Sequence, residues 1–190
     1  MTATLVAYGT GEGQTAKVAD RIVDALRERG HEAEAVDVKR LPRGFDLDAY
    51  DAVLVGGSVH AGRLQRGVRR FVRAHREELA SRPTAFVQVC LSAVDNEEAA
   101  ARAAHDFLRE TEWDPDRVAV LGGALRYSEY GFLKRALMKR IAAESTGDVD
   151  TSRDYEYTDW EEVERFAADF AAFVEGEVGD AAAPREDTPV

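Results

Sequence analysis

The feature of this sequence that most restricts its fold is the alternation of short apolar runs with amphipathic segments. Runs rich in Val, Ala and Leu lie at residues 4–8, 33–38, 52–55, 84–91 and 118–121. Continuous apolar runs of this length are typical of strands that are buried on both faces. The segments between them place apolar residues at i, i+3 and i+4, which is the spacing of one buried helix stripe. The alternation therefore predicts an α/β fold, with a parallel sheet covered by helices on both faces.

Local signals predict where some of these elements begin and end. The helical pattern at 68–79 continues through His75 and Leu79, which predicts one helix there. Residues 39–51 show no helical pattern and are interpreted as a loop. The last helix is expected to be capped by Thr158, because Glu161 follows three residues later as in a capping box.

The length and composition favour one globular domain. The chain has 190 residues, of which 45% are hydrophobic, and this is enough for a substantial core. We expect the domain to span residues 1–175, with an insertion at about 126–158 that is much longer than a usual connection. Residues 176–190 show no apolar periodicity, so we expect an acidic, disordered tail.

Charge and cysteine content disfavour several classes of protein. A net charge of -11 argues against nucleic-acid binding, because phosphate backbones need clustered Lys and Arg. Since no apolar run reaches about 18 residues and no secretory signal is seen, we expect a cytoplasmic protein whose membrane contact is at most peripheral. The one cysteine, Cys90, excludes an internal disulfide and a cysteine-based metal site, and we expect its thiol to be buried. We expect no metal.

The segment between the first strand and the first helix has the composition of an anion-binding loop. Free N–H groups and the positive end of the helix dipole favour phosphate at such a place. The loop adds three glycines, two hydroxyls and one amide: Gly9, Gly11, Gly13, Thr10, Thr15 and Gln14. The spacing matches neither a Walker loop nor a complete dinucleotide fingerprint, so a plain turn is the alternative for this segment alone. Glu12 is expected to point outward, because a carboxylate repels phosphate.

Two further strand ends are expected beside this loop. The third strand ends in "VGGSVHAGRLQ" and the fourth in "VCLSAVDNEE", and in a doubly wound sheet these carboxyl ends open next to the first. Glycines in the third-strand segment would let a flat ring lie against the backbone, while Ser58 and Ser92 would supply polar contacts. His60 is the only titratable ring in these loops and, taken alone, is interpreted as an exposed loop residue.

These residues resemble a known family. Residues 10–15 after a buried strand resemble the phosphate loop of flavodoxins, which hold flavin mononucleotide (FMN). The segments "GALRY", "FLKRALMKRI" and "DTSRDYEYTDWEEV" narrow the resemblance to the flavodoxin-type, menaquinone-dependent protoporphyrinogen IX dehydrogenases (oxidases) of haem biosynthesis. The resemblance covers the chain to about residue 174. It implies a flavodoxin-like, doubly wound, five-stranded parallel sheet of order 2-1-3-4-5, with a helical insertion between the fifth strand and the last helix.

The resemblance also implies which residues bind FMN. The phosphate loop would consist of Thr10, Gly11, Glu12, Gly13, Gln14 and Thr15, and the ring and ribityl chain would be flanked by Ser58, Val59, His60, Ala61, Gly62, Leu91, Ser92, Ala93 and Val94. The sequence departs from the family pattern at Gly9, where a serine is common. It also has no aromatic residue in either ring-flanking loop. FMN would carry the redox chemistry, with protoporphyrinogen IX as substrate and menaquinone as electron acceptor.

The insertion reverses the sign of the charge locally. Residues 126–140 contain five basic residues and one acidic residue. At 100° per residue an apolar stripe forms from Phe132, Leu133, Ala136, Leu137 and Ile141. We expect this stripe to pack on the domain while the basic side chains face substrate carboxylates or the headgroups at the inner face of the cell membrane. The expected contacts are Arg126, Tyr127, Lys134, Arg135 and Lys139. A solvated charged face is the alternative.

Three functions therefore remain open at the level of sequence. The first is an FMN enzyme that oxidises protoporphyrinogen IX and reduces menaquinone. The second is a flavodoxin electron carrier that turns over no small molecule, which the acidic composition favours. The third is a flavodoxin-like binding module without cofactor, which Gly9 and the missing aromatic residues favour.

Overall fold

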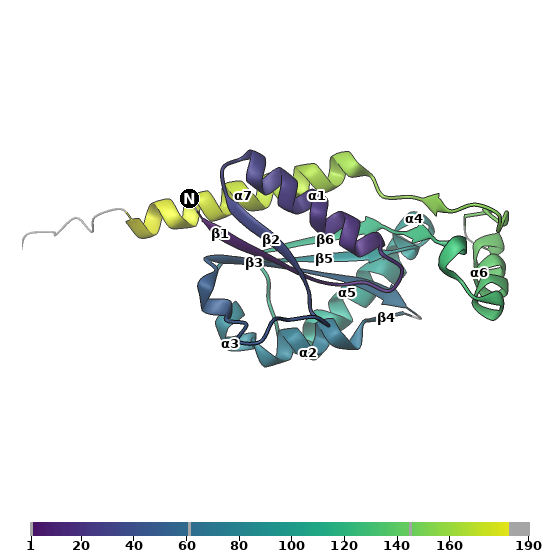
Figure 1. Cartoon of the computed structure of the whole chain (residues 1–190), viewed down its shortest axis with the longest axis horizontal. Coiled ribbons are helices and arrows are strands. Elements are labelled where there is room, and N and C mark those ends of the chain that lie inside the picture. Colours follow the sequence, from purple (N-terminus) through teal and green to yellow (C-terminus); the bar gives the residue numbers. More distant parts are fainter. Residues whose placement is uncertain (1, 61, 145, 183–190) are drawn as a thin grey trace, which may run out of the picture.

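The computed structural model describes residues 2–60, 62–144 and 146–182 of the chain. A twisted sheet runs through the middle of the molecule, with helices above and below it (Figure 1). Its long strands are β1 (Ala3–Gly9), β2 (Glu32–Asp37), β3 (Ala52–His60), β5 (Thr84–Cys90) and β6 (Arg117–Gly122). These are all parallel, in the order β2-β1-β3-β5-β6. The predicted order of five parallel strands is confirmed.

A short sixth strand was not predicted. β4 (Arg63–Leu64) folds back antiparallel on the end of β3. Its Leu64 side chain is buried over Gly57, where an added Cβ would lie 2.7 Å from Leu64 Cδ2. The glycine is therefore needed for this close packing. The turn between β3 and β4 includes Ala61, which is outside the described residues.

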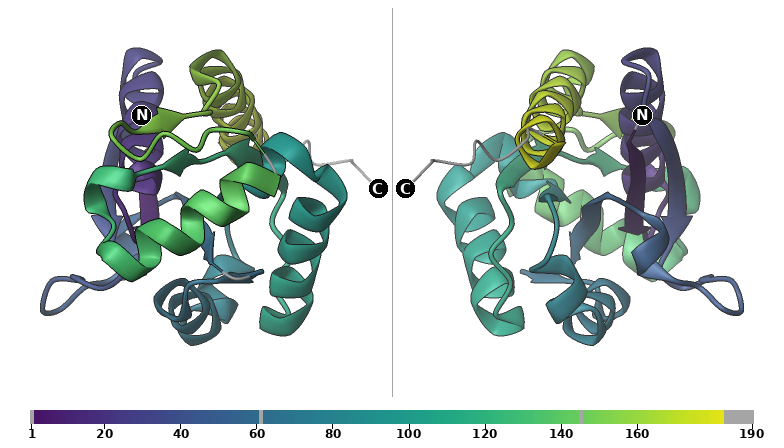
Figure 2. Two further views of the ribbon diagram at one scale, coloured as in Figure 1. Left: turned by 90° about the vertical axis from the view of Figure 1, so that its right-hand side faces the viewer. Right: turned by 90° about the vertical axis from the view of Figure 1, so that its left-hand side faces the viewer.

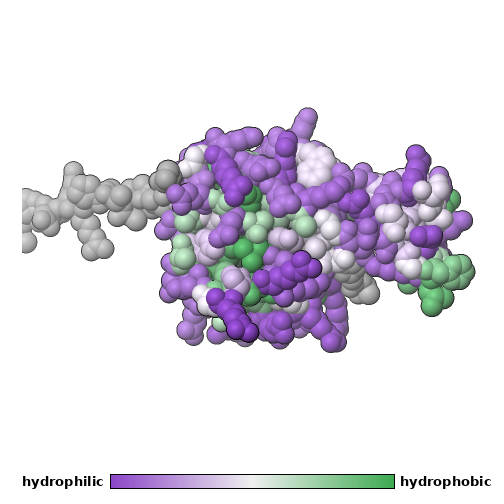
Figure 3. Space-filling view, viewed as in Figure 1, coloured by the Kyte–Doolittle hydropathy of each residue, from purple (hydrophilic) through white to green (hydrophobic). Residues whose placement is uncertain are grey.

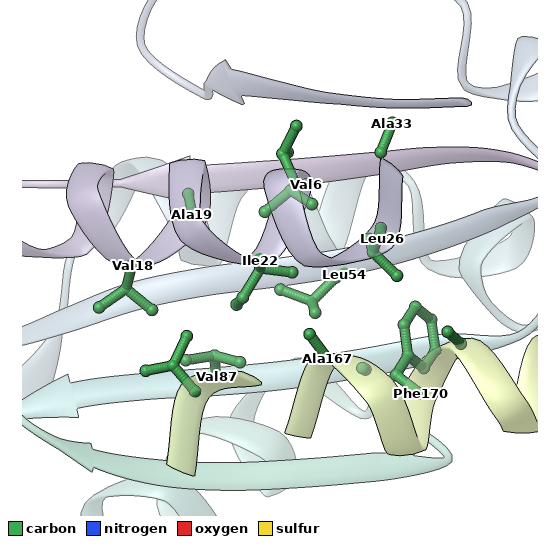
Figure 4. Packing of buried hydrophobic residues seen from close by; sticks show 14 of the residues in the cluster. Val6, Val18, Ala19, Ile22, Leu26, Ala33, Leu54, Val87, Ala167 and Phe170 are labelled. Atoms are coloured by element: carbon green, nitrogen blue, oxygen red, sulfur yellow. The ribbon is translucent and has the colours of Figure 1, made fainter. Parts of the chain in front are cut away.

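Helices cover both faces of the sheet, as predicted. α1 (Gln14–Glu28) and α7 (Trp160–Ala182) lie on one face, and α2 (Arg66–Ala74), α3 (Arg76–Leu79) and α5 (Glu97–Thr111) lie on the other. Neighbouring residues of β1 point to opposite faces, so Val6 packs with α1 and α7 (Figure 4), whereas Leu5 packs with α2 and α5. β2 and β6 are edge strands and are only partly buried, which the apolar runs did not predict.

Several local predictions are corrected by the structure. The helix expected at 68–79 is divided at His75 into α2 and α3, and the expected loop contains one turn of 3-10 helix, η1 (Leu47–Ala49). α7 is capped by Asp159, whose Oδ1 accepts hydrogen bonds from the backbone N–H groups of residues 161 and 162. Thr158 instead donates to the Gly122 carbonyl oxygen at 2.7 Å. The capping-box prediction failed because this hydroxyl is used in a contact with a distant strand.

The boundary of the expected tail is also corrected. α7 continues through residues 176–182, whereas the sequence predicted a disordered tail from 176. A helix can extend past its buried stripe because each added residue gains a backbone hydrogen bond without a new nucleation cost. Residues 183–190 lie outside the described residues, and the domain boundary near 175 stays a prediction.

The insertion lies across the end of the sheet at which the strands finish (Figure 2). It contains β7 (Ala124–Leu125), the 3-10 turn η2 (Tyr127–Glu129), α6 (Phe132–Glu144) and β8 (Tyr155–Glu156), and β7 pairs antiparallel with β8. A separate small core holds it together, made of Leu125, Tyr127, Tyr130 and Ala142, with Met138 packed against it. The short α4 (Ser92–Asp95) lies at the same end of the sheet.

The orientation of α6 is opposite to the prediction. Met138 and Ala142 face the small core, whereas the apolar stripe at 132, 133, 137 and 141 is exposed. The prediction failed because the core of the insertion is filled by tyrosines from outside the helix, so α6 needs only its small and flexible side chains there. No helix within the described residues is long and apolar enough to cross a membrane.

Candidate functional site

The loop between β1 and α1 has the backbone geometry of an anion site. Gly13 is left-handed, with φ 91°, and stands at the N-cap of α1. Its amide donates to Thr10 Oγ1 at 2.9 Å, so the loop is closed by its own threonine. Within the described structure no side chain caps α1, and its first turn carries no acidic residue. The free N–H groups and the positive dipole end of α1 thus face the loop, and no carboxylate in the first turn of the helix neutralises them.

Thr15 adds the observation that points most directly to a ligand. It is 1% exposed, and its Oγ1 has no hydrogen-bond partner among the described residues. An unpaired buried hydroxyl costs about 1–3 kcal/mol. This cost is removed if a phosphate oxygen accepts the hydrogen bond, and Thr15 lines the cavity at the loop.

This cavity brings together residues from all three predicted loops and from the insertion. Its volume is about 80 Å³, which is below the roughly 300–1,000 Å³ of usual ligand pockets. Tyr130, Lys134 and Met138 of the insertion line it together with the strand ends. The predicted residues that line it are Thr10, Gly11, Glu12, Gln14, Thr15, Ser58, Val59, Leu91 and Lys134.

Other predicted residues lie nearby but not on this cavity. Ser92 begins α4, and Ala93 and Val94 line a separate hollow of about 410 Å³ between α4, α5 and β6. Gly62, with φ 73°, is exposed in the turn after β3. Ala61 and the side chain of His60 lie outside the part of the chain that is described. The roles of these residues in flavin binding stay predictions.

The charges around the loop differ from the prediction. Glu12 does not point outward, because its carboxylate lines the cavity and forms an ion pair with Lys134 of α6. The Lys134 ammonium partly offsets the repulsion that we expected between Glu12 and phosphate. Lys39, which follows β2, donates from Nζ to the Thr10 carbonyl oxygen at 2.9 Å. Lysines from distant segments therefore supply the positive charge that the loop itself lacks.

Arg126 connects the insertion to the phosphate loop. Its Nη2 donates to Gln14 Oε1 at 3.4 Å, and its Nη1 lies 3.5 Å from Asp154 Oδ2. Gln14 also donates from Nε2 to Thr158 Oγ1 at 2.9 Å. Burial alone would raise the pKa of Asp154, but hydrogen bonds from Ser128 and the charge of Arg126 lower that pKa below its ordinary value. Arg126 therefore faces a charged carboxylate and orients the first side chain of α1.

The remaining residues predicted to contact substrate have different surroundings. Tyr127 is fully buried, and its hydroxyl donates to the Asp148 carbonyl oxygen at 2.9 Å. It belongs to the core of the insertion, which corrects the expected substrate contact. Arg135 donates from Nε to the Tyr127 carbonyl oxygen at 3.2 Å, whereas Lys139 is exposed.

The predicted site omitted several residues that line the cavity, namely Val89, Cys90, Gly123, Ala124, Tyr130 and Met138, and Tyr130 is the aromatic residue among them. It is 3% exposed and lines the cavity, and Lys134 Nζ lies 4.7 Å from its ring centroid. Burial raises the pKa of Tyr130 to about 12, so the phenol is neutral at physiological pH. The insertion thus brings an aromatic ring to a site whose own loops have none. Its position in the chain close to Arg126, Tyr127 and Lys134, which were predicted to contact substrate, was a signal that Tyr130 belongs to the site. The sequence alone did not distinguish it from Tyr127.

Comparisons with known proteins identify the family to which this fold and phosphate loop belong. A family model described as a flavodoxin domain matches residues 5–152. The protoporphyrinogen IX dehydrogenase [quinone] of Escherichia coli strain K12 is 36% identical over 171 residues, which cover 88% of this chain and 94% of that protein. The chain belongs to this flavodoxin-type family. A protein of the same name from Leishmania major is 34% identical, covering 88% of this chain and 74% of its own length.

Solved structures support the fold. A short-chain flavodoxin associated with a bacterial microcompartment superposes with a TM-score of 0.59 at 12% identity, covering 93% of this chain and 99% of that one. A flavodoxin from the domain Archaea gives a TM-score of 0.54 at 15% identity, covering 91% of this chain and 99% of its own. At these identities the likeness concerns the fold.

Membership of the flavodoxin family makes FMN the cofactor of this site, and the loop fits its phosphate. The uncapped start of α1 and the unpartnered Thr15 hydroxyl are the donors that a phosphate needs. The departure at Gly9 has a packing reason, because an added Cβ would lie 2.4 Å from Gln65 Oε1 and 2.5 Å from Val68 Cγ2. The close packing of Gln65 and Val68 on β1 therefore disfavours a side chain at position 9, and Thr10 and Thr15 remain as hydroxyl donors.

Proposed function

We propose that this protein is an FMN-dependent enzyme that oxidises protoporphyrinogen IX to protoporphyrin IX and passes the electrons to menaquinone in haem biosynthesis. The observation that carries the proposal is the 36% identity with a quinone-dependent protoporphyrinogen IX dehydrogenase over 88% of the chain. The match extends over most of the chain, and the insertion lies across the flavin end of the sheet. We propose that the protein acts in the cytoplasm, at the inner face of the membrane that contains menaquinone.

Each group in the site has a role in this proposal. The loop amides and Thr15 hold the FMN phosphate, and Ser58, Val59 and Leu91 flank the rest of the cofactor. FMN, when bound, supplies the redox chemistry by accepting hydride or electrons. Tyr130 and Met138 keep water from the cavity, since both line it from the insertion side.

Positive side chains are proposed to recognise the substrate carboxylates. Arg126 is the best placed of these, because its buried Nε has no hydrogen-bond partner among the described residues and its Nη2 reaches the phosphate loop. Lys134 and Lys139 follow on α6. A carboxylated tetrapyrrole would thus meet positive charge beside the flavin, in a protein whose net charge is -11.

The proposal is tested by anaerobic turnover of the FMN-loaded protein with protoporphyrinogen IX and a menaquinone analogue. We expect porphyrin fluorescence to appear with protein, FMN and quinone together and not when any one of them is left out. An Arg126→Gln variant should mainly raise the apparent KM for the tetrapyrrole.

Other results would support the alternative functions. A protein that binds FMN but forms no porphyrin, and whose reduced flavin is re-oxidised by a redox protein and not by quinone, would be an electron carrier. A protein that fails to bind FMN at all would be a binding module, and both results would overturn the proposal.

A further inference from the structure

The outer face of α6 is apolar and exposed. Phe132 and Leu133 are 85% and 82% exposed, and Leu137 and Ile141 are 57% and 40% exposed. We call these four residues the α6 apolar face. Figure 3 shows hydrophobic side chains gathered at the end of the molecule that Figure 1 labels α6. Folding gains little from this face, because most of the surface of Phe132 and Leu133 and about half of that of Leu137 and Ile141 stays in water.

Positive charges accompany this face. At 100° per residue, Arg140 lies between the directions of Leu133 and Ala136, and Lys139 lies beside Phe132 at one edge. α6 carries four basic residues and one acidic residue, in a chain of net charge -11. Lys134 and Arg135 are directed to Glu12 and to the Tyr127 carbonyl oxygen. Lys139 thus flanks the apolar face at its Phe132 edge, and Arg140 lies within the face toward the C-terminal end of α6.

We propose that the α6 apolar face docks on the surface of an anionic lipid bilayer, with Lys139 and Arg140 at the level of the headgroups. A helix with an apolar face and flanking cations lies in the interface and gains from both apolar burial and attraction to anionic lipid. The acidic remainder of the protein is repelled by the same surface, so α6 is the end that approaches. The proposal deepens the proposed function by assigning the surface that meets the membrane. The biological purpose of docking rests on the proposed function, whereas the binding of the protein to lipid does not.

A second copy of the chain fits the face less well. In a two-fold contact the same patch meets itself, so Lys139 and Arg140 would approach the same cations of the other copy. A standard interface also takes about 20–30 residues from each partner, whereas this face offers four large side chains. Charge complementarity favours the anionic bilayer.

Docking in this orientation would bring the flavin end of the sheet close to the bilayer. Met138 reaches the cavity from the side of α6 opposite the apolar face, and Lys134 reaches it from beside Ile141 at the edge of that face. The cavity and the proposed docking surface are therefore separated by the thickness of one helix. A quinone dissolved in the bilayer would need to travel only a short way to the site.

The experiment is co-sedimentation of the full chain with large unilamellar vesicles. Vesicles of phosphatidylglycerol and phosphatidylethanolamine are compared with vesicles of phosphatidylcholine. We expect the protein to bind the anionic vesicles more tightly, and Leu133→Gln with Leu137→Gln to lower the partition coefficient at least about tenfold. Lys139→Gln should lower it about fivefold on anionic vesicles and leave the weaker binding to phosphatidylcholine unchanged.

Val118→Gln is the matched control. Val118 is 46% exposed on the edge strand β6, away from α6, and its replacement should leave vesicle binding unchanged. Failure of the unaltered chain to sediment with either kind of vesicle would overturn the proposal, as would equal binding by the Val118→Gln and double leucine variants. Self-association that the leucine changes abolish would assign the face to a second copy and would also overturn it.

A water-soluble quinone separates this proposal from the proposed enzyme activity. With such an acceptor, the double leucine variant should retain porphyrin formation while vesicle binding is lost. Vesicle binding without porphyrin formation by the unaltered protein would leave the docking surface in place and overturn the enzymatic function alone.

Discussion

Replacing Thr15 with valine should change stability and FMN affinity in opposite directions. Valine keeps the shape of threonine but removes the buried Oγ1 that has no partner among the described residues. Burying a hydroxyl without a hydrogen bond costs about 1–3 kcal/mol. The FMN-free variant should therefore unfold at higher urea concentration, with a free energy of unfolding about 1 kcal/mol above that of the unaltered protein.

The same change should weaken the complex with FMN. A hydrogen bond to a charged group contributes about 1.5–3 kcal/mol, so loss of the bond from Thr15 to phosphate should raise the Kd by one to two orders of magnitude. The Kd is measured by titrating FMN fluorescence with the protein. Riboflavin, which lacks the phosphate, should bind the variant and the unaltered protein equally.

Thr4 provides the control for this experiment. Its Oγ1 is also buried and without a partner in the described structure, but it lies near the start of β1, at the opposite end of the strand from the phosphate loop. Thr4→Val should raise stability to a similar extent and leave the FMN Kd unchanged. An unchanged Kd in Thr15→Val, or an equal rise in both variants, would refute the assignment of Thr15 to the phosphate.

Three other predictions concern the surroundings of the site. Gly122→Ala should lower the free energy of unfolding, measured in urea, by about 1–3 kcal/mol, because the added Cβ would lie 2.4 Å from the Tyr157 carbonyl oxygen. Gly131→Ala is the control: its added Cβ meets open space, so it should change the free energy of unfolding by less than about 0.5 kcal/mol. Burial raises the pKa values of Tyr130 and Tyr157 to about 12, against 10.0 for the unperturbed phenol. The unfolded chain therefore loses these protons first, and stability should fall between pH 10 and 12. The slope is at most about 1.4 kcal/mol per pH unit for the buried Tyr130 and smaller for Tyr157, which is partly exposed to solvent. The slope should become shallower if both tyrosines are replaced by Phe. Lys134→Gln should raise the FMN Kd about fivefold at low salt, since it leaves an unpaired carboxylate at the phosphate loop; an unchanged Kd would exclude that role.

The α/β architecture and the position of the phosphate loop could both be predicted from the sequence. Both depend on patterns that are local in the chain. Apolar runs form buried strands, apolar residues at helical spacing form one buried stripe, and glycines with Thr10 and Thr15 after a strand form an anion-binding bend. Because parallel strands end at one edge of the sheet, these patterns also indicated which loops would meet, and the cavity does join the three loops.

The surroundings of that loop depend on contacts between segments that are far apart in the chain. Lys134 meets Glu12 across 122 positions of the chain, and Tyr130 reaches the cavity because the insertion folds over the end of the sheet. The orientation of α6 was decided in the same way. Its periodicity defined an apolar stripe but could not tell which side of the helix would meet the protein, since that depends on which side chains already fill the core of the insertion.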